Sequence, residues 1–276
     1  MFSQFHLLFK LFIFCRYLAT GTTFTAVRYD CRLGISTIGK IVLLLCYALW
    51  STKTNEFFPE PTEERWREMS DDFRINSHFP NCLGAIAGKY ISVPKFPRSS
   101  SMNLNYKCNF SIVLMANADS DYKFTYVDIG AYGNDCDSSV FRKTSFFKLL
   151  ILNKLHIQPS DPLFTNDTEN CPFVFVGDEA FSLSEKLMRP YAGHNLMRPY
   201  AGHNLSEKQK IFNCRLRRAR RNVERAFGIL SNKWRILHTA LNVSKELFKN
   251  IVKARVILHN LIRSKDGYRS EINIYI

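Results

Sequence analysis

The order of strand-like and helix-like segments after residue 79 constrains the fold of this chain more than any other feature. Apolar runs rich in β-branched residues predict strands, and segments with helical periodicity predict helices. The predicted strands span 82–93, 109–118, 122–130 and 173–178, and the predicted helices span 138–155, 206–231 and 244–263. The polar turn Asp119–Ser120–Asp121 joins the second and third strands as a hairpin. This order predicts an α/β domain in which helices cover a mixed sheet.

The first 58 residues predict a small helical region. Thr22 or Thr23 can cap a helix that ends near Cys31, and Ser36 can cap a second helix that runs to Trp50. Two helices joined by a glycine-containing turn have the outline of a helix-turn-helix motif. The second helix is so apolar that few side chains could read base edges, which favours a structural bundle.

The first fourteen residues, MFSQFHLLFKLFIF, could pass for a signal peptide. His6 and Lys10 interrupt the apolar run, and it is too short for a membrane span. We therefore expect a buried helix and no membrane association. The eight cysteines never lie within four residues of each other, which excludes a zinc knuckle and a CxxC pair and predicts reduced core thiols.

The positive charge is concentrated near the C-terminal end. Residues 205–276 contain 17 Lys and Arg against 5 Asp and Glu, a net +12, whereas residues 1–204 contain 21 against 19, a net +2. This asymmetry indicates a face turned toward a polyanion, although a solvated basic helix would give the same count. The run RLRRARR at 215–221 could contact phosphates or act as a nuclear-import signal. The arginines proposed to bind nucleic acid are Arg217, Arg218, Arg220, Arg221 and Arg225.

Three acids stand where the predicted elements could bring them together. In a meander the third strand runs parallel to the first, and a crossover places the fourth strand beside the first, also parallel. Their C-terminal ends then share one sheet edge, where Asp178 would neighbour Ala87 and Asp137 could reach from its loop. Glu224 borders the apolar stripe of the basic helix.

Gathered carboxylates bind Mg²⁺ or Mn²⁺, because hard cations take oxygen ligands. Two such ions would activate water or a 3′-hydroxyl and stabilise the leaving oxygen of a phosphodiester. Each acid also has a plain interpretation. Glu224 lies at i,i+4 spacing from an arginine and could simply form an ion pair, and Asp137 and Asp178 could be helix caps or turn acids.

Several blocks of the sequence together resemble the Harbinger transposase-derived nuclease family, over about residues 16–265. The blocks are RYLATGTTF, FPNCLGAIAGKY, YKCNFSIVLMANADSDYKFTYVDIGAYGNDCDSSVFR, FVFVGDEAF, LMRPYAGHNLSEKQKIFNCRLRRARRNVERAFGIL and IVKARVILHNLIR. The resemblance implies an RNase H-like fold and a divalent-metal nuclease that acts on DNA through an Asp, Asp, Glu set with an additional Asp. It also implies a Myb-like DNA-binding partner and a nuclear, possibly also cytoplasmic, location.

By position, the resemblance assigns the metal-binding and catalytic roles to Asp137, Asp178 and Glu224. Which aspartate is the second member of the triad stays open, although the strand topology favours Asp178. The implied domain boundaries are 1–58 for the helical region, 59–78 for a connector, 79–265 for the nuclease domain and 266–276 for a tail.

Two departures from the family pattern affect the expected activity. Ala87 occupies the position of the first aspartate, and LMRPYAGHN occurs twice in tandem, at 187–195 and 196–204. The first change removes a metal ligand, so we predict an intact fold, weakened metal affinity and feeble or absent cutting. The alternatives are an inactive DNA-binding or assembly protein and a decaying gene without a selected role.

Overall fold

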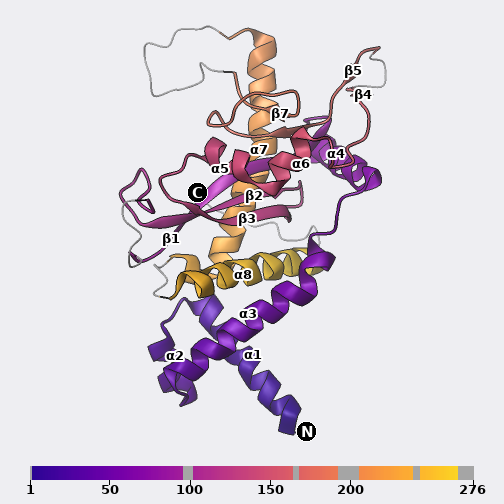
Figure 1. The fold of residues 1–276 in the computed structure, drawn as a ribbon. Helices are drawn as coiled ribbons and strands as arrows, with labels where there is room; N and C mark the ends of the chain where they lie inside the picture. Colours follow the sequence, from indigo (N-terminus) through magenta and orange to yellow (C-terminus); the bar gives the residue numbers. More distant parts are fainter. Residues whose placement is uncertain (1, 96–101, 164–167, 192–204, 239–242, 267–276) are drawn as a thin grey trace.

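The computed structural model describes residues 2–95, 102–163, 168–191, 205–238 and 243–266. At its centre lies a five-stranded sheet in the order β3-β2-β1-β6-β7 (Figure 1). The strands of this sheet are β1 (Cys82–Ser92), β2 (Ser111–Ala118), β3 (Phe124–Tyr132), β6 (Val174–Val176) and β7 (Leu187–Met188). A separate two-stranded sheet consists of β4 (Asp161–Pro162) and β5 (Asn170–Cys171).

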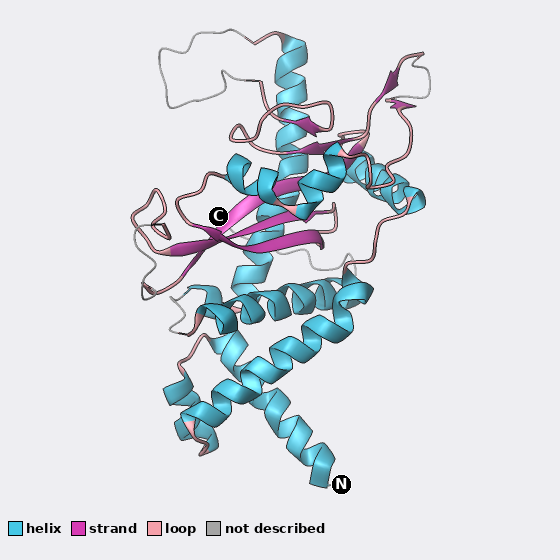
Figure 2. Ribbon diagram, in the orientation of Figure 1, coloured by secondary structure: helices cyan, strands magenta, loops and turns pink. Residues whose placement is uncertain are grey.

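Helices cover both faces of the central sheet, as Figure 2 shows. The helices of the described chain are α1 (Phe2–Thr20), α2 (Phe24–Cys31), α3 (Ile35–Phe57), α4 (Glu63–Ser77), α5 (Asp137–Lys143), α6 (Ser145–Ile151), α7 (Glu207–Lys233) and α8 (Lys245–Asp266), with a short 3₁₀ helix η1 (Arg235–His238) between the last two. Of these, α1–α3 lie beyond α8 and away from the sheet (Figure 1). The predicted RNase H-like α/β architecture, a mixed sheet flanked by helices with a helical N-terminal region, is confirmed.

The predicted strand topology is also confirmed. β1, β2 and β3 form an antiparallel meander, and β6 pairs with β1 in parallel, with Ala85 opposite Val176. The fourth strand is shorter than predicted, so Asp178 lies two residues beyond its end. The sequence analysis did not predict β4, β5 and β7, because strands of two residues carry no alternating pattern.

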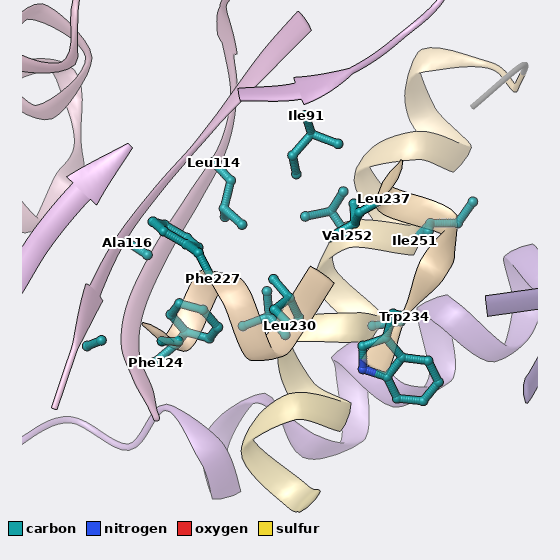
Figure 3. Close-up of a cluster of buried hydrophobic side chains, with 14 of the residues drawn as sticks. Ile91, Leu114, Ala116, Phe124, Phe227, Leu230, Trp234, Leu237, Ile251 and Val252 are labelled. Carbon is teal, nitrogen blue, oxygen red and sulfur yellow. The ribbon is translucent and has the colours of Figure 1, made fainter. Parts of the chain in front are cut away.

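Alternating side chains of the strands build two apolar cores on opposite faces of the sheet. Val113 and Met115 of β2 face the core beneath α5 and α6, whereas Leu114 and Ala116 face the core beneath α7 and α8. Figure 3 shows the second core, in which Phe227 of α7 lies between the sheet and α8. β2 is buried along its whole length because helices cover both of its faces.

The N-terminal helices join this second core instead of forming a separate one. Val27 and Val42 are fully buried in the same cluster as the sheet residues, and α3 lies against α8 (Figure 1). By length and composition α3 is long and apolar enough to cross a membrane, and 17% of its apolar window is buried. Mostly buried core helices and signal sequences pass the same test, so a single such helix is weak evidence for a membrane span. The predicted burial of the first helix is only half right. Leu8 and Phe12 are 64% and 53% exposed, because within the described residues packing begins at Ile13.

Other predicted details needed correction. Thr23 caps α2, as one of the two predicted alternatives. Gly34, not Ser36, precedes α3, which continues past Trp50 because the first helix breaker is Pro59. All eight cysteines are free, but Cys46 and Cys82 alone are buried, so most of them are not core thiols.

The segment predicted as one helix at 138–155 is two helices, separated at Thr144. The backbone of Thr144 is extended, and its hydroxyl accepts a hydrogen bond from the amide of Phe147 and caps α6. The same hydroxyl donates to the carbonyl of Phe141 at the end of α5. Local side chain to backbone bonding of this kind competes with helix continuation at threonine.

The start of strand β3 is fixed by two polar side chains of α8. Asn260 accepts from the amide of Phe124 at 2.9 Å and donates to its carbonyl at 2.7 Å, as a neighbouring strand would. His259 donates from Nε2 to the carbonyl of Tyr122 at 2.7 Å. Burial lowers the pKa of His259 to about 4, so the ring is neutral near pH 7. The adjacent polar residues His259 and Asn260, within an otherwise apolar part of the helix, were the sequence signal for this contact with β3.

Asp119 in the β2–β3 turn makes the stability of the fold depend on pH. Its Oδ1 accepts from the amides of Asp121 and Lys123 at 3.0 and 2.8 Å, and burial raises its pKa to about 6. Asparagine would keep this acceptor without ionising. We expect Asp119→Asn to stabilise the protein at pH 7.5 by up to about 3 kcal/mol, from a shift of roughly two pKa units.

The gain should shrink at lower pH. An acid with a raised pKa favours folding while it is protonated, and that contribution is lost as the pH rises from about 4 through about 6. Urea unfolding of both proteins at pH 4.5 and pH 7.5 measures the difference. An equal difference at the two pH values would contradict the role assigned to Asp119.

Candidate active site

Asp178 follows the C-terminal end of β6 by two residues. The last pair of the parallel ladder is Ala85 with Val176, and the register continued by two residues would set Asp178 level with Ala87. Its Oδ1 accepts from the amide of Ala180 at 2.9 Å, and its carbonyl accepts from the amide of Phe181 at 3.2 Å. This turn directs the chain away from the sheet and leaves Asp178 half-buried at the strand end.

Asp137 begins α5 and packs directly against Gly88 of β1. A Cβ atom at residue 88 would lie 2.5 Å from Oδ1 of Asp137, so only glycine lets this carboxylate approach the strand. Oδ1 is buried and has no hydrogen-bond partner among the described residues. Burial raises the pKa of Asp137, the charge of Asp178 raises it further, and the backbone amide of Gly88 lowers it. The two aspartates are therefore electrostatic neighbours.

Ala87 and Asp137 lie on opposite faces of β1. Ala87 packs against the core that includes α7, together with Ala85 and Ile91, which follow the same alternation. Gly88 belongs to the other set, with Ile86 facing α5 and α6. A side chain at position 87 therefore faces α7, whereas Asp137 reaches β1 from the α5 side.

A pocket of about 280 Å³ lies on the α7 side, next to Asp178. Its lining residues come from the loops after β6 and β7 and from α7, and they are Asp178, Glu179, Ala180, Pro190, Asn213, Arg217 and Arg220. Two of the arginines predicted to bind nucleic acid thus share a pocket with one of the predicted acids. A carboxylate beside two guanidinium groups suits a phosphate that approaches an acidic centre.

Glu224 lies on α7 one turn after Arg220, and these two residues form an ion pair of 2.7 Å. Its side chain is 47% exposed. The plain i,i+4 alternative is therefore present in the structure. No three acids, histidines or cysteines in the described parts of the chain are close enough together to hold a metal ion. Among the described residues, the expected convergence of Asp137, Asp178 and Glu224 into one cluster is therefore not seen.

The other arginines form an exposed basic face on α7. Arg217, Arg218, Arg221 and Arg225 are exposed, and Arg220 is half-buried. Arg225 also donates to the hydroxyl of Tyr122 at 3.0 Å. The apolar side of α7 faces the sheet through Leu216, Ala219 and Val223, so the charged side is turned outward. The exposed run leaves most guanidinium groups available for phosphate contacts.

The donor set fits a divalent cation only in part. The buried, unpartnered oxygen of Asp137 and the adjacent carboxylate of Asp178 are hard oxygen donors of the kind that Mg²⁺ and Mn²⁺ prefer. The methyl group of Ala87 offers no ligand, and Glu224 is engaged by Arg220. Two carboxylates remain where a complete set would have more.

Asn213 is a site residue that the sequence analysis missed. Its side chain is 2% exposed, and it accepts from the amide of Tyr191 at 2.8 Å and donates to the carbonyl of Tyr191 at 3.2 Å. It thereby ties the loop after β7 to α7, beside the pocket. The sequence signal that could have predicted this contact is an asparagine within the apolar stripe of the helix, where a buried amide needs hydrogen-bond partners. The second copy of the repeat, 196–204, lies outside the described residues, as do positions 267–276 of the predicted tail.

Comparison with known proteins assigns the family. The family model described as DDE superfamily endonuclease matches residues 89–260, more than half of the chain. The chain is also 30% identical over 198 residues to "Protein ALP1-like" of Arabidopsis thaliana, which covers 71% of this chain but 46% of that protein. It therefore spans less than half the length of this curated relative. No solved structure matches the chain. In agreement with the resemblance of its sequence blocks to Harbinger transposase-derived nucleases, the chain belongs to the DDE superfamily endonucleases.

Proposed function

We propose that this chain is a DNA-binding, transposase-derived nuclease domain whose metal-dependent cutting is strongly impaired. The observation that carries the proposal is the half-complete acid set at one edge of the sheet. The charge of Asp178 raises the pKa of Asp137, which supports a shared site, and the strand position that the register would set level with Asp178 is Ala87. The exposed arginines of α7 supply the phosphate-binding surface beside this edge.

The two aspartates would hold a divalent cation. When bound, such an ion supplies Lewis-acid stabilisation of charge on phosphodiester oxygens. The residues of the chain have other tasks in this proposal. Arg217 and Arg220 would orient a phosphate in the pocket beside Asp178, and Glu224 would join the acids on leaving Arg220. We assign Asp178 to the second triad position because the register would set it level with Ala87 and it shares the α7 side, and we assign the supplementary role to Asp137.

The alternative is a protein that binds DNA and has no residual cutting, and the ion pair between Glu224 and Arg220 favours it. In both cases we also propose that the run 215–221 acts as a nuclear-import signal and that the protein divides between the nucleus and the cytoplasm. A Myb-like DNA-binding partner would help select the target, as the family resemblance implies.

The proposal predicts salt-dependent DNA binding without appreciable nicking. We expect the purified chain to bind a 30-bp duplex, with an affinity that falls as KCl rises from 50 to 300 mM. Replacing Arg217, Arg218 and Arg221 by glutamine should reduce the slope of log affinity against log salt by about 2–3, for three phosphate contacts. Supercoiled plasmid with Mn²⁺ should be nicked no faster than with an Asp178→Asn variant.

A charge-matched variant is the control for this prediction. Lys40, Lys148 and Lys154 are exposed and lie away from α7, so changing them to glutamine removes the same charge elsewhere. If this control variant reduces the slope as much as the arginine variant, α7 is not the DNA-binding face. Vigorous nicking that depends on Asp178 would contradict the impairment.

A further inference from the structure

Helix α8 presents three lysines on one side at four-residue spacing. They are Lys245, Lys249 and Lys253, which we call the α8 lysine row. At 1.5 Å rise per residue the row is about 12 Å long. It lies on a different helix from the arginines of α7.

Each lysine of the row is held against a neighbouring element. Lys245 Nζ lies 5.1 Å from the ring centre of Tyr132, at the end of β3. Lys253 Nζ lies 4.9 Å from the ring centre of Trp50 in α3. Between them, Lys249 passes over Gly130, where a Cβ atom would lie 2.6 Å from its Nζ. Gly130 has a φ of +127°, a second reason why this position is glycine. Two of the ammonium groups therefore lie against β3, and the third lies against α3.

The positive charges of the row are not neutralised within the described structure. None of the three lysines is in an ion pair, and cation–π contacts leave the full charge on the ammonium group. Three carboxylates with described side chains lie on these elements, and none is in an ion pair with a lysine of the row. They are Glu246 on α8, Asp128 on β3 and Glu56 on α3, the last of which pairs with Lys53. Three fixed, unpaired cations in 12 Å of helix suit a polyanion with closely spaced charges.

The row and Asp137 lie on opposite faces of the sheet. Helix α8 packs in the core that contains Leu114 and Ala116, whereas Asp137 begins α5, which packs in the other core. The row is therefore a surface separate from the side on which Asp137 approaches β1.

We propose that the α8 lysine row is a second DNA-binding surface, which holds three or four successive phosphates of one strand on the side of the sheet that α7 and α8 cover. It deepens the proposed function and rests on the chain binding DNA. Phosphates along one strand of a duplex recur every 3.4 Å of axis, so a 12 Å row spans that number. The exposed rim of Tyr132 would lie against the sugar or base next to these phosphates.

The test compares four versions of the full chain on one labelled 30-bp duplex and on one of its strands. They are the wild type, Lys245/Lys249/Lys253→Gln, the α7 arginine variant, and the Lys40/Lys148/Lys154→Gln control. We expect the row variant to lose affinity on the order of 10²-fold at 0.15 M salt and about 2–3 in salt slope. The control should lose only a few-fold. Circular dichroism should be the same for all four, because glutamine is a good helix former.

The outcomes separate the two proposals. If the wild type and the control bind DNA and the row variant binds equally well, the α8 row is overturned while the proposed function stands. If the wild type does not bind DNA, the proposed function fails and the row fails with it. Binding of the row to vesicles of anionic lipid, with no loss of DNA affinity in the row variant, would assign it to membranes and overturn this inference.

Discussion

Ala87→Asp is expected to raise Mn²⁺-dependent nicking of supercoiled DNA by on the order of 10³-fold. The new carboxylate would extend from β1 toward α7, on the side of Asp178 and the pocket with Arg217. It would supply the ligand that the methyl group lacks and a negative charge that draws a cation to the sheet edge. Groups that act as a unit lose most of their effect when one member is missing, so restoring that member should return most of it.

Three measurements make this result specific. Calorimetric titration should show tighter Mn²⁺ binding to the revertant than to the wild type, which does not depend on cutting. In Ala87→Asn the new side chain has nearly the same shape as the aspartate of the revertant but carries no charge. This variant should leave nicking at the wild-type level. Adding Asp178→Asn to the revertant should remove the gain. If Ala87→Asp changes neither metal affinity nor nicking, the impairment has another origin and the assignment of position 87 is wrong.

Arg255→Met is expected to raise the free energy of unfolding by about 1–4 kcal/mol, as replacement of buried charges by apolar groups often does. Arg255 is fully buried in α8, and burial lowers its pKa well below the usual range. Its Nη2 donates to the carbonyl of Trp234 at 2.7 Å, but Nε and Nη1 have no partner in the described structure. Methionine would fill most of the volume without a charge to desolvate.

The carbonyl of Trp234 would keep a partner, because it also accepts from the amide of Leu237 at 3.1 Å. Thermal unfolding measures the gain, at about 2–4 °C per kcal/mol for a domain of this size. Arg255→Lys is the control, since it retains a buried charge and should not stabilise. If Arg255→Met lowers the melting temperature, the guanidinium group makes stabilising interactions that methionine cannot make, and the prediction is wrong.

The strand order, including the parallel pairing of β6 with β1, was predictable from the sequence. The apolar runs set the strands, and a meander followed by a crossover leaves few topologies. The side of β1 from which Asp137 approaches was not predictable. It depends on the absence of a Cβ atom at Gly88, a contact between residues 49 positions apart.

The state of Glu224 shows a different limit. Helical spacing predicted both a metal-binding acid and an ion pair with Arg220, and spacing cannot choose between them. In the structure the ion pair with Arg220 is present. The break at Thr144 was missed for a related reason. A buried threonine cap and a helix-interior threonine look alike in a periodic pattern.

Helices α1–α3, the sheet and α8 share one apolar cluster, so the N-terminal and C-terminal parts of the chain depend on each other for folding. A shortened chain that started near Pro59 would lack α3, and the side of α8 that packs against α3 would be exposed to water. We expect such a chain to aggregate or to be degraded. Recombination that separates the N-terminal coding region from the rest is therefore expected to give no stably folded product.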